Sequence, residues 1–368
     1  MTFTVLHTES SKGWGGQESR ILHEAIGLGK LGARVIILGQ PGSGLTQRAA
    51  EHGIETRHVA MRNSFDFAAI RAMLRIIRAD RVDVINTHSG RDTLLAGLAG
   101  RLSRSRPLIV RTRHLALPIT SRWTYSILPH KVVTVSNYVR EYLLGTGVKP
   151  GQVVTIHTGI SFDRFQPGDE HASLKAELGL REDTPLIATV AILRNKKGHQ
   201  VLLEAIPRVL AEFPSAVFIF AGNGPQQQNI ERTIREKGLG DRVRLLGLRK
   251  DVPAILKSCD MFVLPTLEEA LGTSFIEAMA MEKPVIGCNV GGVPEVIRDG
   301  VNGILVKAGD PGDLAQAIIR LLQDPAAARK MGSAGKAVAN AEYSVETMCQ
   351  RMFQLYQDML QQRVQRLP

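Results

Sequence analysis

Short apolar segments alternate with helix-like segments along the whole chain. In the first half these apolar segments are rich in β-branched residues, and they fall at 4–6, 32–39, 82–86, 108–110 and 132–135. Between the first two, a turn-rich loop leads into a helix predicted from about Gln17 to Leu31. Uniformly apolar strands separated by helices indicate a parallel sheet that is covered by helices on both faces.

The same pattern restarts after a polar segment. New strands are predicted at 186–190, 216–220, 261–264 and 284–286, and the turn-rich residues 165–170 before them form a predicted linker. We therefore expect two domains, at residues 1–165 and 166–345. The predicted fold class is α/β, with two Rossmann-like doubly wound domains that face a central cleft, where the ligand is expected.

The last segment, residues 346–368, has the pattern of a single amphipathic helix. Apolar residues recur there at three- and four-residue spacing, at Met348, Met352, Leu355, Tyr356 and Met359. A helix packed on a core is favoured over a partner-binding or membrane helix, and we expect it to pack back on the N-terminal domain.

Composition narrows the class of protein. Of 368 residues, 44% are hydrophobic and 22% charged, which is typical of globular proteins. The N-terminus lacks a signal-peptide pattern, and no apolar stretch approaches the roughly 18 residues of a membrane-spanning helix. Cys259, Cys288 and Cys349 are far apart and form no CxxC pair, which argues against disulfides or a zinc site. A cytoplasmic location is expected, and Cys288 is expected in the core.

The positive charge is concentrated in the N-terminal half. The chain has 46 Lys+Arg and 35 Asp+Glu, a net charge of +11, and residues 1–165 hold 22 basic and 11 acidic side chains. Arg101, Arg104 and Arg106 form a tight group. This asymmetry suits a polyanionic partner, such as nucleic acid, an anionic membrane or an acidic acceptor, but it also suits a merely solubilising surface. No recognition-helix or RNA-binding pattern accompanies the charge, so nucleic acid is not expected.

A glycine-rich loop lies between the first strand and the first helix. Residues 12–18 read Lys-Gly-Trp-Gly-Gly-Gln-Glu, and Gly15 and Gly16 would let backbone amides approach an anion at the helix N-terminus. The spacing is neither a GxGxxG fingerprint nor a Walker loop. A plain tight turn is the competing interpretation.

Basic residues follow the first strand of the second domain. Residues 194–199 read Arg-Asn-Lys-Lys-Gly-His, and cations such as Arg194 and Lys197 at the carboxyl end of a strand suit a diphosphate. A solvated basic turn is the alternative.

Two glutamates eight residues apart are a stronger signal. Glu269 is predicted in a loop, and Glu277 in a helix that begins near Gly272 or Thr273. The amides of Gly272, Thr273 and Ser274 would suit phosphate oxygens, while carboxylates accept hydrogen bonds from sugar hydroxyls. Glu269 could instead simply complement the helix dipole.

Taken together, these motifs resemble those of the family 4 glycosyltransferases, which are retaining sugar transferases of the GT-B fold. The resemblance covers nearly the whole chain and is carried by residues 15–18, 135–136, 159–167, 197–198, 222–225, the EX7E spacing at 269–277, and 291–295.

The resemblance implies a role for each matching residue. Glu277 would bind the ribose hydroxyls, Glu269 the donor sugar and diphosphate, and Lys197 would neutralise the departing diphosphate. Gly16 would bring backbone amides close to that leaving group. His114 matches a family histidine beside the donor sugar, and His88 is a weaker candidate.

One position departs from the family pattern. The arginine expected five residues before Lys197 is Ile192, and Arg194 is the candidate to supply the missing cation. No DxD-like metal motif lies at the expected donor site, so we expect neither a metal nor a cofactor, the nucleotide-sugar being a substrate.

The expected activity is transfer of a hexose or heptose from a nucleotide-sugar donor to a cell-envelope glycolipid or oligosaccharide. The lipopolysaccharide core is the favoured acceptor, and a peripheral position at the anionic inner face of the bacterial cytoplasmic membrane is expected. The alternatives are a GT-B epimerase or phosphorylase and, more distantly, a basic nucleic-acid-binding protein.

Overall fold

The computed structural model describes residues 2–115, 118–119, 121–165 and 174–365. The chain divides into unit 1, made of Met1–Gly159 and Val345–Pro368, and unit 2, made of Ile160–Ser344. The chain therefore passes between the units at two places, whereas the sequence predicted boundaries at 165/166 and 345/346. Most of the predicted linker, at residues 166–170, lies outside the described residues.

Unit 1 is built on a seven-stranded parallel sheet with the strand order β3-β2-β1-β4-β5-β6-β7. Val5 of the first strand pairs with Val35 on one side and Val84 on the other. The strands are β1 (Thr4–Thr8), β2 (Arg34–Gly39), β3 (Glu55–His58), β4 (Val84–Thr87), β5 (Leu108–Arg113), β6 (Lys131–Thr134) and β7 (Val153–Thr155).

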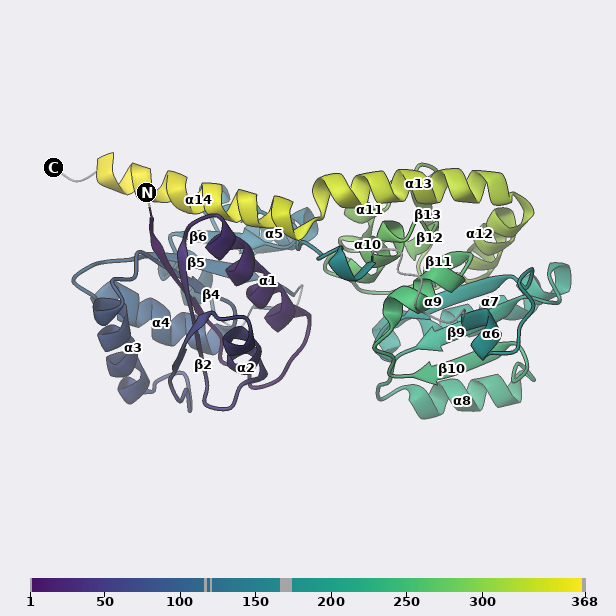
Figure 1. Cartoon of the computed structure of the whole chain (residues 1–368), viewed down its shortest axis with the longest axis horizontal. Coiled ribbons are helices and arrows are strands. Elements are labelled where there is room, and N and C mark those ends of the chain that lie inside the picture. Colours follow the sequence, from purple (N-terminus) through teal and green to yellow (C-terminus); the bar gives the residue numbers. More distant parts are fainter. Residues whose placement is uncertain (1, 116–117, 120, 166–173, 366–368) are drawn as a thin grey trace. The chain divides into compact units, whose positions relative to one another are not determined.

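Helices cover both faces of this sheet. They are α1 (Gly16–Lys30), α2 (Gly44–Glu51), α3 (Phe67–Ala79), α4 (Gly90–Leu102), α5 (Asn137–Gly145) and α14 (Val345–Gln365). The C-terminal helix α14 lies along α1 (Figure 1). A Cβ atom on Gly27 would lie 2.3 Å from Cys349 Sγ, so glycine permits this close packing. Met348, Met352 and Tyr356 of α14 belong to the same core cluster as Val5.

Unit 2 has a six-stranded parallel sheet with the order β10-β9-β8-β11-β12-β13. Its strands are β8 (Leu186–Val190), β9 (Val217–Ala221), β10 (Val243–Gly247), β11 (Met261–Leu264), β12 (Val285–Cys288) and β13 (Gly303–Val306). Its helices are α6 (Leu174–Glu177), α7 (His199–Glu212), α8 (Gln227–Glu236), α9 (Val252–Ser258), α10 (Thr273–Ala280), α11 (Val293–Val296), α12 (Pro311–Gln323) and α13 (Pro325–Glu342).

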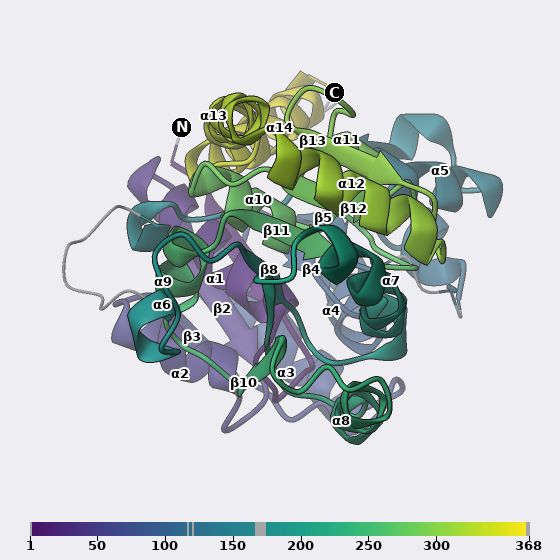
Figure 2. The same cartoon turned by 90° about the vertical axis from the view of Figure 1, so that its right-hand side faces the viewer.

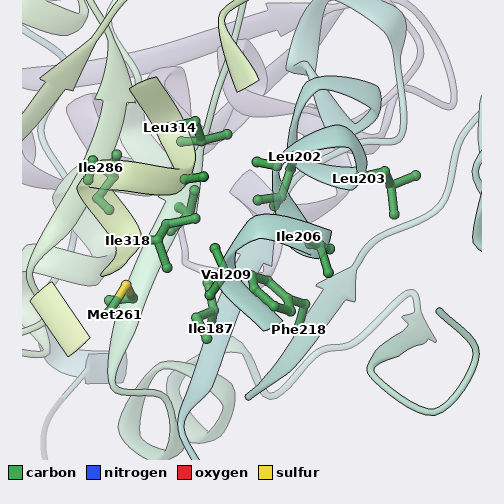
Figure 3. Packing of buried hydrophobic residues seen from close by; sticks show 14 of the residues in the cluster. Ile187, Leu202, Leu203, Ile206, Val209, Phe218, Met261, Ile286, Leu314 and Ile318 are labelled. Atoms are coloured by element: carbon green, nitrogen blue, oxygen red, sulfur yellow. The ribbon is translucent and has the colours of Figure 1, made fainter. Parts of the chain in front are cut away.

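The helices of unit 2 lie on both flanks of its sheet, with α7 and α12 on one side of β8 and α9 on the other (Figure 2). On the α7 side, Leu202 and Ile206 meet Ile318 of α12 and Phe218 of β9 in one buried cluster (Figure 3). Cys288 is buried in this cluster, as predicted. Both units are thus doubly wound α/β folds, which confirms the predicted fold class.

The predicted strands and the observed strands agree best in the sheet centres. The strands predicted at 186–190 and 261–264 coincide with β8 and β11. The sequence analysis missed β3, β7 and β10, which all lie at sheet edges. β3, with the sequence Glu-Thr-Arg-His, has no apolar run, and β7 is only three residues long. No helix in the described part of the chain is long and apolar enough to cross a membrane.

Candidate functional site

Two loops meet at the carboxyl ends of β8 and β11 in unit 2. The Lys196 carbonyl accepts hydrogen bonds from the Leu267 amide, at 2.7 Å, and from Thr266 Oγ1, at 2.9 Å. Lys197 Nζ forms an ion pair with Glu269 Oε2, and the two side chains are only 17% and 16% exposed. The structure therefore brings together two residues that the sequence analysis selected separately.

Glycines allow these loops to touch. Gly198 has a φ of +71°, and a Cβ atom there would lie 1.8 Å from the Pro265 carbonyl oxygen. A Cβ on Gly291, which has a φ of +55°, would lie 2.0 Å from the Glu269 carbonyl oxygen. The Gly292 amide donates to that same oxygen at 3.1 Å. The glycine-rich motif at 291–295 thus holds the backbone of the Glu269 loop in place.

Helix α10 begins directly after the Glu269 loop. Gly272 precedes it with a φ of +95°, and no side chain caps the helix. Thr273 and Ser274 are its first two residues, so their amides lack intrahelical acceptors and favour an anion. Glu277 lies in the second turn and is half-buried. This places the predicted phosphate-binding amides and both glutamates around one helix start.

Arg194 lies in the same loop as Lys197 but is exposed. Its amide donates to the Ile192 carbonyl at 2.8 Å, and its carbonyl accepts from the Lys197 amide at 2.9 Å, so the backbone turns tightly here. Within the residues described, the Arg194 side chain has no hydrogen-bond or ion-pair partner. Ile192 is 52% exposed and contributes no charge.

The sequence analysis gave no role to His199, the first residue of α7. Its ring is 3% exposed, and neither ring nitrogen has a hydrogen-bond partner among the described residues. Burial, followed by the charge of Lys197, lowers the pKa of His199 to about 4. The signal was available, because His199 directly follows the Lys197–Gly198 motif.

In unit 1, α1 begins at Gly16 with Gly15 as its N-cap. No side chain caps this helix, and both glycines are exposed. A Cβ atom on Gly16 would meet nothing within 4 Å. The Glu18 carboxylate lies in the first turn, with Oε2 3.4 Å from the position that a Cβ atom on Gly15 would take, and the binding of an anion by this loop stays a prediction.

Three histidines form a chain at the carboxyl edge of the unit 1 sheet. His7 lies in β1, His88 follows β4, and His114 follows β5. His7 Nδ1 lies 3.0 Å from His88 Nε2, and His88 Nδ1 lies 3.0 Å from His114 Nε2. The sequence analysis selected the last two singly and missed His7, which was hidden in an apolar strand.

A buried polar cluster lies at the inner end of this chain. Glu24 Oε1 is 4.0 Å from His7 Nε2, and it accepts hydrogen bonds from the Tyr356 hydroxyl and from Asn86 Nδ2, each at 3.2 Å. Arg20 Nε lies 3.6 Å from Glu24 Oε2. The C-terminal helix α14 thus reaches the histidine chain through Tyr356.

Burial keeps the three imidazoles neutral. It lowers the pKa of His7, and it lowers the pKa values of His88 and His114 well below the ordinary value. The next cause for His114 is the charge of Arg20. A neutral imidazole has one donor and one acceptor nitrogen, so the protons in the chain must all point in one direction.

Two carboxyls lie near the histidine chain. Asp92 accepts from Thr8 Oγ1 at 2.9 Å and from the His88 amide at 2.8 Å. Glu9 accepts from the Ser11 amide at 2.7 Å. Burial, followed by the charge of Asp92, raises the pKa of Glu9 to about 8.

Two arginines of unit 1, Arg101 and Arg111, make different kinds of contact. Arg101 NH2 donates to the carbonyls of Ile127 and Leu128, both at 2.9 Å. Arg111 is 3% exposed, and its Cζ lies 3.6 Å from the centre of the Tyr125 ring. Arg101 therefore supports a loop while remaining exposed, and Arg111 packs in the interior; the predicted role of the Arg101–Arg104–Arg106 group stays a prediction.

Two family models match this chain. Residues 14–164 match the model described as Glycosyltransferase Family 4, and residues 171–338 match the model described as Glycosyl transferases group 1. Between them they cover most of the sequence.

Individual proteins agree with these matches. The N-acetyl-alpha-D-glucosaminyl L-malate synthase of Bacillus anthracis is 27% identical over 307 residues, which cover 80% of each chain. The UDP-Gal:alpha-D-GlcNAc-diphosphoundecaprenol alpha-1,3-galactosyltransferase of Escherichia coli is 25% identical over 276 residues, covering 70% of this chain and 71% of the relative. A solved glycosyltransferase structure from Rickettsia africae superimposes with a TM-score of 0.88 at 23% identity, covering 98% of this chain and 99% of that one.

Proposed function

Because the chain belongs to the family 4 glycosyltransferases, we propose that it transfers a hexose or heptose from a nucleotide-sugar to a cell-envelope glycolipid or oligosaccharide, with retention of configuration. The observation that carries this proposal is the Lys197–Glu269 ion pair beside the uncapped start of α10. It combines a cation, free amides and sugar-binding carboxylates, which are the groups that a nucleotide-diphosphate sugar requires.

The donor would be held mainly by unit 2. The amides of Thr273 and Ser274 would bind phosphate oxygens, Glu277 would accept from the ribose hydroxyls, and Glu269 from the hydroxyls of the sugar. Lys197 would exchange part of its contact with Glu269 for the diphosphate. A half-buried ammonium interacts strongly with an anion because little water screens it.

The reaction exchanges one bond for another at the anomeric carbon. The bond from that carbon to the diphosphate oxygen breaks, and a bond to the acceptor oxygen forms on the same face. The acceptor hydroxyl proton goes to the departing phosphate. Lys197 and Arg194 would stabilise the growing negative charge, which is worth about 3 kcal/mol for one well-placed donor. We propose a metal-independent reaction because the sequence has no DxD-like motif.

The family resemblance assigns Gly16 to the leaving group and His114 to the donor sugar, and we propose these roles here, with Gly15 as the neighbouring binding residue of the same loop. Glu24 favours a proton on His7 Nε2, so His7 Nδ1 accepts from His88, and His88 Nδ1 accepts from His114 Nε2. His114 Nδ1 is then left as an acceptor for a sugar hydroxyl. His7 and His88 are positioning residues in this proposal, because they act only through His114.

The acceptor that we favour is the lipopolysaccharide core. The Escherichia coli relative named above acts on a diphosphoundecaprenol-linked sugar, which supports a lipid-linked acceptor for this chain. We therefore place the protein in the cytoplasm, in peripheral contact with the anionic inner face of the cytoplasmic membrane. The positive charge of unit 1 supports this placement.

A thermal-shift screen with UDP-, GDP- and ADP-sugars tests the donor. The cognate donor should raise the melting temperature of the wild type, because a ligand that binds only the native state stabilises it. Glu277→Gln should fold normally but lose most of that shift. If no sugar nucleotide shifts the wild type, the proposal fails. Epimerised donor in the absence of acceptor would identify an epimerase, and bound pyridoxal phosphate would identify a phosphorylase.

A further inference from the structure

A groove of about 870 Å³ opens at the amino ends of β1 and β4 in unit 1. Its walls come from α3, from the turn before β4, from the segment after α4 and from the end of α14. Six arginines line it, namely Arg71, Arg75, Arg78, Arg81, Arg104 and Arg363. Since the strands are parallel, this edge is opposite to the one that carries His88 and His114. The groove is therefore separate from the histidine chain.

The positive charge of the groove is not compensated. The first five of these arginines are exposed, and none of their side chains has a hydrogen-bond or ion-pair partner among the residues that the structure describes. Arg363 NH2 donates only to the Ser105 carbonyl, at 2.6 Å. Asp83 is the one acidic residue in the lining, and its carboxylate accepts from the Thr4 amide at 2.8 Å. A polyanion or phosphate group would supply the missing negative charge.

The groove is also apolar. Phe3, Ile77 and Leu360 contribute to its lining, and Leu102 and Val364 also line it while remaining 68% and 62% exposed. Large exposed aliphatic side chains beside unpaired arginines suit a molecule with a charged head and an apolar body.

Helix α3 extends this surface away from the groove. Arg71, Arg75 and Arg78 share one face of the helix with Phe67, which is 79% exposed and lies one turn before Arg71. The opposite face, with Ile70 among others, is buried in the core. Because the apolar face of α3 is buried in the core, its outer face presents three basic side chains and one exposed aromatic ring, which suits an anionic surface.

We propose that the groove binds the phosphate headgroup of an anionic phospholipid in a bilayer surface. The arginines contact the phosphate, while Leu102, Val364 and Phe67 reach the boundary of the acyl chains. This inference names the surface for the membrane contact proposed above and rests on that proposal. The groove takes the place of the Arg101–Arg104–Arg106 group as the candidate membrane-contacting surface, since only Arg104 of that group lines the groove.

Vesicle binding tests the proposal directly. We expect the full chain to sediment with vesicles of phosphatidylglycerol and phosphatidylcholine, to ignore vesicles of phosphatidylcholine alone, and to dissociate in high salt. Each arginine near an anionic leaflet strengthens binding about fivefold. The R71Q/R75Q/R78Q variant should therefore lose on the order of 100-fold in partition coefficient.

The matched control removes three charges elsewhere. Arg235, Arg329 and Lys330 of unit 2 are exposed, and their side chains have no partner in the described chain, so R235Q/R329Q/K330Q changes the net charge equally. It should bind vesicles within a few-fold of wild type. L102S/V364S keeps every charge and should weaken binding severalfold, which a purely electrostatic attraction would not predict. Circular dichroism and donor-induced thermal shifts verify folding of each variant.

Several outcomes would overturn the proposal. If the two triple variants lose binding equally, the groove is not the site, although the membrane contact stands. If the wild type ignores anionic vesicles, both proposals about the membrane fail, while sugar transfer to a soluble acceptor fragment is judged separately. If the wild type binds an oligonucleotide but not vesicles, and only R71Q/R75Q/R78Q loses that binding, the groove is a nucleic-acid surface. Stabilisation by glycerol phosphate without vesicle binding would identify a site for a free phosphate.

Discussion

The two units use the same sheet architecture but build their candidate sites in different ways. Unit 1 relies on buried charge, and among the described residues it buries nine acidic, basic or histidine side chains: His7, Glu9, Glu18, Arg20, Glu24, Asp80, His88, Asp92 and Arg111. Unit 2 buries two, Lys175 and His199, and positions its loops by backbone contacts at glycines. The difference teaches that one fold can preorganise a site either through a hydrogen-bonded interior or through close backbone packing.

The two units also differ in charge. Unit 1 contains 24 Lys and Arg against 12 Asp and Glu, whereas unit 2 contains 22 against 23. A buried network of ionisable groups costs desolvation energy, which well-placed partners must offset, so losing a partner destabilises it.

A backbone contact made by glycines is instead disturbed by any added side-chain atom. The four predictions below test how each unit responds to such changes.

The largest effect is expected from the cation of unit 2. Lys197→Ala should lower kcat by about 10²–10³ while changing the donor Kd much less, because charge on the diphosphate grows as the bond breaks. Steady-state kinetics and donor titration measure the two effects. Arg194→Ala should lower kcat as well if it replaces the arginine absent at Ile192. Wild-type kinetics in the Arg194 variant would show that Arg194 does not replace the family arginine that is absent at Ile192.

The next largest effect is expected from the glycine contacts. Gly291→Ala places a Cβ atom 2.0 Å from the Glu269 carbonyl oxygen and should lower the free energy of unfolding by about 3 kcal/mol. Gly300→Ala is the control, since Gly300 also has a positive φ, of +72°, but a Cβ atom there would meet nothing within 4 Å. Urea denaturation measures both, and equal losses would mean that only backbone strain matters.

In unit 1, Glu9 should make stability depend on pH. Its pKa is raised from 4.5 to about 8, so the folded chain holds a proton between these values that the unfolded chain releases. The stabilisation is therefore complete below about pH 4.5 and is lost as pH rises through 8. Relative to wild type, Glu9→Gln should therefore stabilise the protein more at pH 9 than at pH 4.5. Thermal unfolding across this range measures it, and a constant difference would contradict the raised pKa.

The smallest effect is expected at the C-terminal helix. Tyr356→Phe removes a donor to Glu24 and an acceptor for Asn86 Nδ2, and it should lower the free energy of unfolding by about 1–2 kcal/mol. Tyr343→Phe in unit 2 removes a bond to the neutral carbonyl of Glu295 and should cost less. If Tyr343→Phe lowers the free energy of unfolding more than Tyr356→Phe does, hydrogen bonds to buried ionisable groups do not make unit 1 the more sensitive unit.

The sequence predicted those features that depend on local pattern. The central strands, the loop position of Glu269 and the helical position of Glu277 follow from apolar runs and glycines near them. The Lys197–Glu269 contact could not be read from the sequence, since 72 residues separate the partners and only the sheet order joins them. His7 and Glu24 were missed because His7 lies in an apolar strand and Glu24 in an ordinary helix. Neither local sequence pattern indicates that the two side chains are buried next to each other.

Helix α14 affects the order in which the two units can complete their cores during synthesis. Residues 1–159 are synthesised first, but the core of unit 1 also contains Met348, Met352 and Tyr356. Until those residues leave the ribosome, that core is open and Glu24 lacks the Tyr356 hydroxyl. Unit 2, at Ile160–Ser344, is continuous in the chain and can close its core as soon as Ser344 is free. The unit that begins first in synthesis is thus the one that is completed last.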